Sequence, residues 1–376
     1  MKKRLLSMIL AISMVLTFLP VSAISAFAAD ESSAQPMTGN CGYSGDFPNV
    51  SSDKVKYTLI QNNTDNDNPT YTLKIEGTGK MAYYDSSAKV PWNSYRASIT
   101  KAKIEDGVTS ICNSAFSNCS GLSSISLPQS LTSIGSSAFY GCSSLTSITI
   151  PENVTSIPSW AFRSCTKLTT VKIEGKIKTI SDNAFGGCTA LSEFTIPASV
   201  TDIRYDAFGG CSSLSSVTIP KGVTEIDNGV FGGCSNLSSV TFLGPVTKIG
   251  QSAFSYCSSL TSDSFALPET VTTIGQNAFD QCKGLTFFKI PSKVTTLDYS
   301  TFGACTNLAS VDLNNVTRIG NSVFSGCSSL TSIDLHNITS IGRYAFWNCS
   351  KLTSVALPGD NVSLDDSIFD GCTGLT

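Results

Sequence analysis

The sequence predicts a solenoid of stacked coils, and three observations lead to this prediction. A single cysteine recurs twelve times between residues 119 and 372, at steps of 23 residues six times and then 25, 23, 22, 22 and 23. A phenylalanine stands three residues before each of these cysteines, so twelve of the twenty Phe form a second column. A unit of this length is too short to bury its own apolar face, so neighbouring units must stack and share one core.

The repeating unit reads C-x-x-L-x-x-I-x-I-P-x-x-V-T-x-I-G-x-x-A-F-x-x. Leu145, Ile148 and Ile150 alternate like a short strand with one buried face. Pro151 should end that strand, because proline cannot donate to a strand ladder. Gly135 and its equivalents should open a turn, and A-F-x-x-C should form a turn, helical or 3₁₀, opposite the strands. We therefore expect short parallel strands stacked on one face and turns, short helical or 3₁₀ segments on the other.

The first 29 residues are typical of a secretory signal peptide. Basic residues at positions 2–4 precede the apolar run LLSMILAISMVLTFL, and small residues follow up to Ala29. The apolar run ends at Pro20, and no later stretch of the mature chain is apolar over a membrane-spanning length. We expect a secreted or cell-surface protein with a signal peptide at 1–29, a linker and β-rich capping module at 30–98, and about twelve repeats at 99–376, the last one incomplete.

Charge and composition limit the classes of partner. Removal of residues 1–28 takes away three of the 25 basic residues and none of the 28 acidic ones, which leaves 22 against 28 and a net charge of −6. This mild acidity argues against nucleic acid as a partner. Charged residues make up 14% of the chain and apolar residues 41%, which argues against disorder. The oligomeric state is not set by these numbers.

The cysteine column predicts free thiols. Equivalent residues in adjacent coils lie about 4.8 Å apart and point in parallel, whereas a disulfide needs Cβ atoms about 3.5–4.5 Å apart and angled toward each other. We expect the twelve to fill a narrow buried column beside the phenylalanines, although exported proteins usually oxidise their cysteines. No C-x-x-C pair is present, so no metal site or cofactor is expected. Cys41 and Cys112 stand outside the column, and a bond between them is an open alternative.

The segment before the repeats predicts a small β module. Two strand-like runs, at 55–60 and 71–75, flank the polar loop QNNTDNDNPT, which indicates a hairpin. Such a module would cover the open edge and exposed core of the first coil, with Trp92 and Tyr95 inserted against it. Its expected role is capping rather than catalysis.

Phrases such as AFYGCSSLTSITIPENVTSI and AFGGCSSLSSVTIPKGVTEI resemble the leucine-rich repeats of the BspA-like surface-antigen family. The resemblance covers roughly residues 99–376, and residues 38–98 resemble the N-terminal module that often precedes such repeats. It implies adhesion or ligand binding at a cell surface, to host or other extracellular proteins or to cells, without catalysis. It brings no residue-level binding motif. The chain stops within a repeat, so we expect it to be a fragment of a longer protein.

Two other functions stay open beside a binding scaffold. A structural stalk that presents a further domain would have the same regular, polar surface. A thiol-dependent enzyme is disfavoured, because the single histidine, His336, falls in a turn and no oriented Cys/His/Asn set is discernible. The string LPETV at 267–271 is internal and fits the ordinary I-P-x-x-V of the repeat rather than a wall anchor.

The candidate binding surface consists of the strand residues that alternate with the buried ones, because these line one face of the stacked strands. Most are Ser or Thr, which are good strand formers. Phe287 and Lys289 differ, since they place an aromatic ring and a cation on the open face while Phe288 fills the core. An outward aromatic residue can anchor a partner. The predicted contact residues are Phe287, Lys289, Lys172 and Glu193.

Overall fold

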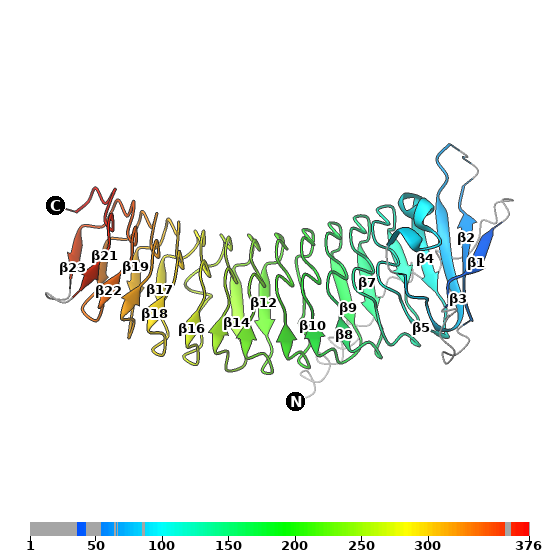
Figure 1. Ribbon diagram of the computed structural model, residues 1–376, viewed down its shortest axis with the longest axis horizontal. Coiled ribbons are helices and arrows are strands. Elements are labelled where there is room, and N and C mark those ends of the chain that lie inside the picture. The colour runs from blue at the N-terminus through cyan, green and yellow to red at the C-terminus, as the bar shows by residue number, and fades with distance from the viewer. Residues whose placement is uncertain are drawn as a thin grey trace, which may run out of the picture.

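The computed structural model describes residues 36–42, 54–63, 65, 67–84, 87–357 and 362–375. Over these residues the chain winds into a gently bowed stack of coils, with a β-rich module beside the first coil (Figure 1). The architecture confirms the predicted solenoid with an N-terminal β-rich cap. The signal peptide predicted over 1–29 lies outside the described residues.

The first column of strands comes from the L-x-x-I-x-I part of each repeat. Its residues alternate between buried and exposed, as in β7, where Ile148 and Ile150 point into the core. β7 ends directly before Pro151, as predicted. The strands of this column are β4 (Ile99–Ile104), β6 (Ser124–Ser126), β7 (Ser147–Ile150), β9 (Thr170–Ile173), β12 (Ser216–Ile219), β14 (Ser239–Phe242), β17 (Phe287–Lys289), β19 (Ser310–Asp312), β21 (Ser332–Asp334) and β23 (Ser354–Ala356).

A second column of very short strands comes from the V-T-x-I part, for which the sequence analysis predicted no strand. Its members pair in parallel, coil to coil, as Thr179 does with Asp202. A two-residue strand is too short to show an alternating pattern, so periodicity could not reveal it. These strands are β5 (Val108–Ser110), β8 (Ser156–Ile157), β10 (Thr179–Ile180), β11 (Asp202–Ile203), β13 (Glu225–Ile226), β15 (Lys248–Ile249), β16 (Thr273–Ile274), β18 (Thr296–Leu297), β20 (Arg318–Ile319), β22 (Ser340–Ile341) and β24 (Ser363–Leu364).

Changes in repeat length leave the strand register intact. β15 pairs with β16 through Lys248 and Thr273 across the 25-residue step, and β20 pairs with β22 across a 22-residue step. The longer coil forms a turn at 262–264 where its neighbours form a first-column strand. There the Ser262 hydroxyl accepts a hydrogen bond from the Phe287 amide at 2.9 Å and donates one to the Phe287 carbonyl at 2.6 Å. A side chain thus replaces the missing strand contact.

The A-F-x-x-C segment forms turns rather than a helix. In each coil the residues five before and one before the column cysteine have positive φ, as Trp160 (63°) and Ser164 (61°) do, and this interrupts any helical run. Alternate amides therefore point along the solenoid. The Phe139 amide donates to the Ala161 carbonyl of the next coil at 2.8 Å, and the amides two residues to either side do the same. We call this set of bonds the turn ladder.

The twelve column phenylalanines form one continuous stack through the core. All eleven neighbouring pairs have ring centroids 5.2–5.7 Å apart and ring planes within 2–16° of parallel. Each column cysteine from Cys142 to Cys372 donates its thiol proton to the carbonyl of the preceding coil's phenylalanine, at 3.0–3.2 Å. Cysteine is therefore a small core residue with one well-placed weak donor.

All fourteen cysteines are buried free thiols, as predicted for the twelve of the column. Burial raises the pKa of Cys119 and of Cys211 to about 12, so the nucleophilic thiolate is scarce at neutral pH. Cys41 and Cys112 are free as well. Residues 81 and 82 lie between the chain segments that carry these two cysteines. The Ala82 amide donates to the Cys41 carbonyl at 2.7 Å, and the Met81 amide donates at 3.3 Å to the carbonyl of Ser110, two residues before Cys112.

Serine and threonine side chains add further bonds between coils. The Thr132 hydroxyl donates to the Thr109 carbonyl at 2.9 Å in the V-T part of the repeat, and Thr247 does the same to Thr224 at 3.2 Å. Hydroxyls just before the first strand column also donate to the preceding coil, as from Ser123 to the Thr100 carbonyl. The high Ser and Thr content thus has a structural reason in addition to strand propensity.

The N-terminal module continues the first strand column. β1 (Met37–Asn40), β2 (Lys54–Gln61) and β3 (Tyr71–Lys80) are antiparallel, and β3 then pairs in parallel with β4 of the first coil. The predicted strands at 55–60 and 71–75 are confirmed within β2 and β3, whereas β1 was not predicted. Two 3₁₀ turns, η3 (Ser87–Lys89) and η4 (Asn93–Ser98), bring Trp92 and Arg96 against the first coil.

Trp92 and Arg96 supply the donors that a preceding coil would otherwise bring to the turn ladder. Trp92 is fully buried against Phe116, and its indole N–H donates to the Ala115 carbonyl at 2.8 Å. The Arg96 guanidinium donates to the carbonyl of Ser117, and burial lowers its pKa. The sequence predicted the insertion of Trp92 but missed Arg96. Tyr95, also predicted to insert, packs on Tyr71 at a centroid distance of 5.2 Å.

Truncation of a central ring should disrupt the stack. Phe208 is fully buried and lies between Phe185 and Phe231, with Phe194 edge-on at 5.0 Å. We expect Phe208→Ala to destabilise the protein by about 3–5 kcal/mol and to lower the melting temperature clearly. Phe287→Ala, at an exposed ring, is the control and should change it little. Equal melting temperatures for both variants would contradict the role of the stack.

Thiol alkylation tests the buried cysteine column. Iodoacetamide at pH 7 should add no groups to the column cysteines of the native protein, because the thiols are buried and protonated. After unfolding in guanidinium chloride without reductant, intact mass should show fourteen adducts. Adducts that form only after addition of a reductant would show that the cysteines are bridged or modified.

Removal of the Arg96 donors should loosen the first coil. Arg96→Met leaves the buried Ser117 carbonyl without its charged donor, which typically costs about 1.5–3 kcal/mol. Because coils contact only their neighbours, faster amide hydrogen exchange should be confined to the first two coils. Arg204→Met is the control, since Arg204 is exposed and its ion pair with Asp202 is 3.7 Å long. Unchanged exchange in Arg96→Met would rule out the capping role.

Candidate functional site

The outward residues of the first strand column form a surface that we call the strand face. Phe287, Lys289 and Lys172 lie exposed on it, and Glu193 is exposed at the equivalent place of a coil in which no first-column strand forms. Phe287 has 45% of its surface exposed, and Phe288 beside it is buried, as the alternation predicted. The backbone of Phe287 is held on one side by Ser262 and on the other by β19. The exposed ring is therefore mounted on a well-fixed strand.

Lys289 lies beside Phe287 in an ion pair. Its ammonium is 3.0 Å from the Glu269 carboxylate, which also accepts hydrogen bonds from the Ser292 amide at 3.0 Å and the Ser292 hydroxyl at 3.1 Å. The Ser292 amide, the Lys289 ammonium and the Ser292 hydroxyl lower the pKa of Glu269 to about 2. No sequence pattern indicated this partner, because Glu269 stands 20 residues earlier, within the LPETV string. Phe287, Lys289 and Glu269 thus form a small amphipathic cluster.

Lys172 and Glu193 lie in neighbouring coils, away from that cluster. Lys172 bonds at 2.8 Å to Glu174, which also accepts a hydrogen bond from Gln129 at 2.9 Å. Four coil steps of about 4.8 Å separate the Glu193 coil from the Phe287 coil, or about 19 Å. The structure therefore places the four predicted residues on one face but does not bring them into a single pocket. Only a partner with an extended surface could contact all of them.

His336 lies exposed in a turn, as predicted, and its Nδ1 is 2.8 Å from a carboxylate oxygen of Asp334. The column cysteines are buried in the core, whereas both members of this pair are largely exposed. The histidine is therefore not arranged as a base for a thiol nucleophile.

A second surface, which the sequence did not reveal, is formed by the turns. We define the turn face as the residues from six before to one before each column cysteine. Its exposed aromatic residues stand at different places in different repeats, so no periodic pattern marks them. They are Trp160, Tyr205, Tyr256, Tyr299, Tyr344 and Trp347.

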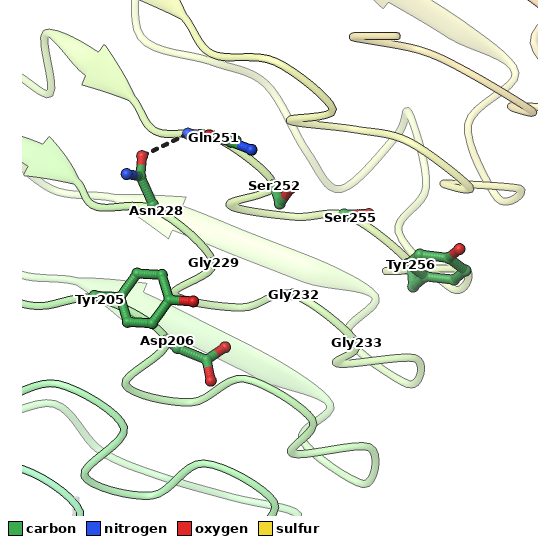
Figure 2. Close-up of a pocket in the computed structure, with 10 residues that line it drawn as sticks. All are labelled: Tyr205, Asp206, Asn228, Gly229, Gly232, Gly233, Gln251, Ser252, Ser255 and Tyr256. Carbon is green, nitrogen blue, oxygen red and sulfur yellow. Dashed lines mark hydrogen bonds between the residues drawn. The ribbon is translucent and has the colours of Figure 1, made fainter.

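The turn face contains a shallow hollow of about 450 Å³ with Tyr205 and Tyr256 at opposite sides (Figure 2). Gly229, Gly232 and Gly233 form part of its lining, so bare backbone lies between the two rings. In three consecutive coils both residues between the column Phe and Cys are glycine, at 186–187, 209–210 and 232–233. Of these pairs, Gly232 and Gly233 line the hollow, so it lies where that coil lacks the side chains that other coils carry.

Asp206 brings a carboxylate into the hollow. Burial raises its pKa, and the Arg163 guanidinium, 3.4 Å from Oδ2, acts in the opposite direction. A Cβ added to Gly209 would lie 1.8 Å from Oδ1, so the carboxylate can rest on this turn only because residue 209 is glycine. Arg163 in turn stacks over Trp160, with its guanidinium carbon 4.5 Å from the ring centroid.

Two absences concern the part of the chain that the structure describes. Within it, no group of three or more His, Cys, Asp or Glu side chains could hold a metal ion. Within it, no helix has the length and apolar character needed to cross a membrane.

Comparison with solved structures finds similar bacterial proteins. A leucine-rich repeat protein from Eubacterium ventriosum is 25% identical, with a TM-score of 0.52 and coverage of 91% of this chain and 84% of its own. A leucine rich cell surface protein from Faecalibacterium prausnitzii is 26% identical, with a TM-score of 0.50 and coverage of 92% and 95%. A leucine-rich repeat protein from Bacteroides ovatus, at 23% identity and a TM-score of 0.62 with coverage of 88% and 94%, shares the fold. The search of curated proteins finds no match.

A family model described as "BspA type Leucine rich repeat region (6 copies)" matches the chain three times, over residues 94–214, 179–266 and 261–376. Together these matches span the whole run of column cysteines and more than half of the chain. They agree with the stacked parallel strands and the repeat register described above. The chain belongs to the BspA-type leucine-rich repeat family.

Proposed function

We propose that this protein is displayed outside the cell and binds an extracellular protein partner through its strand face, without catalysis. The observation that carries the proposal is the cluster of Phe287, Lys289 and Glu269. It is an exposed aromatic ring beside a fixed ion pair, on a face otherwise formed mostly by short hydroxyl side chains. Aromatic residues flanked by polar groups are typical anchors of protein interfaces.

The geometry of the strand face supports a partner with an extended surface. The strands are held in register from coil to coil, so the exposed residues keep fixed spacings. Two groups of charged residues, around Lys172 and around Lys289, lie several coils apart. A folded protein could contact both groups at once, and weak contacts at separate points combine to give useful affinity.

Location outside the cell is supported by the sequence of residues 1–29 and by the family. The F. prausnitzii protein that this chain resembles is a cell surface protein. We propose the following organisation of the protein. A leader at 1–29 precedes a mature chain with two units, the module at 30–98 and the repeats at 99–376.

A catalytic role for the thiols is disfavoured by their environment. Burial raises the pKa of Cys119 and of Cys211 to about 12, and the side chains of the column cysteines pack in the core. Nucleophilic cysteines need the opposite, a lowered pKa and access to substrate.

Replacement of Phe287 tests the proposal. Full-length protein is applied to immobilised collagen, laminin and fibronectin in turn, and binding is measured by surface plasmon resonance. Phe287→Ala should weaken binding to whichever protein is recognised about tenfold or more, which is the loss expected at an interface anchor. Tyr83→Ala is the control, because Tyr83 has 65% of its surface exposed but lies in the N-terminal module.

Two outcomes would count against the proposal. If Phe287→Ala and Tyr83→Ala bind equally well, the strand face is not the contact surface. If none of the proteins is bound at micromolar concentration, a structural stalk becomes the better account. The unbroken phenylalanine stack favours that alternative, since it makes the array a continuous, regular support.

A further inference from the structure

We propose that the hollow on the turn face is a carbohydrate subsite that takes a neutral sugar unit between Tyr205 and Tyr256. It lies on a surface different from the strand face, so this inference does not depend on the proposed function. Its volume of about 450 Å³ falls within the range of about 300–1,000 Å³ that is usual for small-molecule sites.

The glycines of the hollow are not required by the turn itself. Gly229 and Gly233 have φ values of 68° and 75°, but other repeats place large residues at the same positions with the same backbone, namely Trp160 at 63° and Tyr256 at 60°. Gly232 occupies the place that Trp347 fills in another repeat. Other repeats carry bulky side chains at all three positions, so the backbone conformation alone does not require glycine, and glycine there keeps the surface open. A Cβ at Gly232 would lie 3.1 Å from the Ser252 carbonyl oxygen, which is a close contact.

The two tyrosines offer aromatic surfaces at the sides of this opening. Tyr205 and Tyr256 have 53% and 57% of their surfaces exposed. Their coils lie two steps, or about 10 Å, apart along the solenoid, and within the turn Tyr205 stands six residues and Tyr256 one residue before the column cysteine. Sugar rings present patches of polarised C–H groups, and the electron-rich face of an aromatic ring attracts such groups. Two rings with open backbone between them therefore suit a short segment of a glycan (Figure 2).

The polar groups of the hollow suit hydroxyl groups. Asp206 contributes an acceptor, and Oδ1 lies near Gly209 and Gly229 while Oδ2 faces Arg163. The Asn228 side-chain oxygen accepts a hydrogen bond from the Gln251 backbone amide at 2.7 Å, which fixes this side chain at the rim of the hollow (Figure 2). A sugar hydroxyl both donates and accepts, so neighbouring hydroxyls can satisfy a carboxylate and an amide together.

Other ligand classes fit less well. Asp206 and Arg163 form a nearly neutral pair, so the hollow has no net positive charge to attract phosphate, sulfate or acidic sugars. Arg163, 3.4 Å from the Asp206 carboxylate, already balances its charge and so weakens the attraction for a cation. The floor is glycine backbone rather than an apolar groove, so it gives no anchor for an amphipathic helix. The ligand class that fits best is therefore a neutral molecule with both hydroxyl groups and apolar C–H faces.

Ligand-observed saturation-transfer NMR tests the inference with the full-length protein. The probes are cellobiose, maltose, lactose and diacetylchitobiose, each at a few millimolar, since a single small subsite is expected to bind at about 1 mM. At least one disaccharide should show saturation transfer, with the strongest signals at ring C–H protons. Glucuronic acid, an acidic sugar, should show less transfer than glucose.

Two variants and a control locate the binding. Gly232→Tyr fills the hollow with a side chain that the turn tolerates, because another repeat carries Tyr140 at the same place, and Tyr256→Ala removes one wall. Both should weaken the recognised sugar about tenfold while the melting temperature stays the same. Tyr299→Ala is the control, because Tyr299 has the same repeat position as Tyr205 and similar exposure but lies outside the hollow.

The inference is overturned if no disaccharide shows saturation transfer, if Gly232→Tyr binds as well as the unaltered protein, or if Tyr299→Ala loses binding equally. Phe287→Ala should bind the sugar normally. Loss of protein binding in that variant with sugar binding retained would therefore separate this subsite from the contact surface proposed above.

Discussion

The hydrogen bond from the amide of each column phenylalanine, from Phe116 to Phe346, to a carbonyl of the next coil controls the rest of the fold. It sets the spacing at which the rings stack face to face and brings each cysteine thiol onto the phenylalanine carbonyl of the preceding coil. That carbonyl also accepts the amide of the cysteine in its own coil, as Phe185 does from Cys188. Backbone groups that would be buried without partners are thereby satisfied in every repeat, and the apolar core can close around them.

Features that recur could be predicted from the sequence. Chance cannot explain the Phe and Cys columns or the alternating pattern of the first strands, because they recur along the repeats. These features predicted the solenoid and the buried thiols. The second strand column was missed because two residues show no periodicity. Arg96 was missed because the cap occurs once and its partners are backbone carbonyls, which no sequence pattern displays. The candidate residues around Phe287 followed from alternation, whereas Glu269 and the hollow depend on contacts between coils.

The scaffold and its surfaces are largely independent of each other. Core positions hold nearly the same residues in each coil, whereas strand-face and turn-face positions vary from Ser and Gly to Lys, Tyr and Trp. Left-handed turn residues usually restrict side-chain choice, but here Trp160 and Tyr256 occupy them as well as glycine does. A repeat array of this kind can therefore present different chemistry at each coil while its backbone stays the same, which suits a binding protein.

The turn ladder gives the solenoid a chemical direction. Its amides all point toward the following coil and its carbonyls toward the preceding one. The N-terminal module meets the carbonyl side with an indole and a guanidinium, two groups that can only donate. Any structure that covers the opposite side of such a ladder must instead present acceptors. The two kinds of cap are thus chemical opposites. If they were exchanged, donors would face donors on the amide side and acceptors would face acceptors on the carbonyl side.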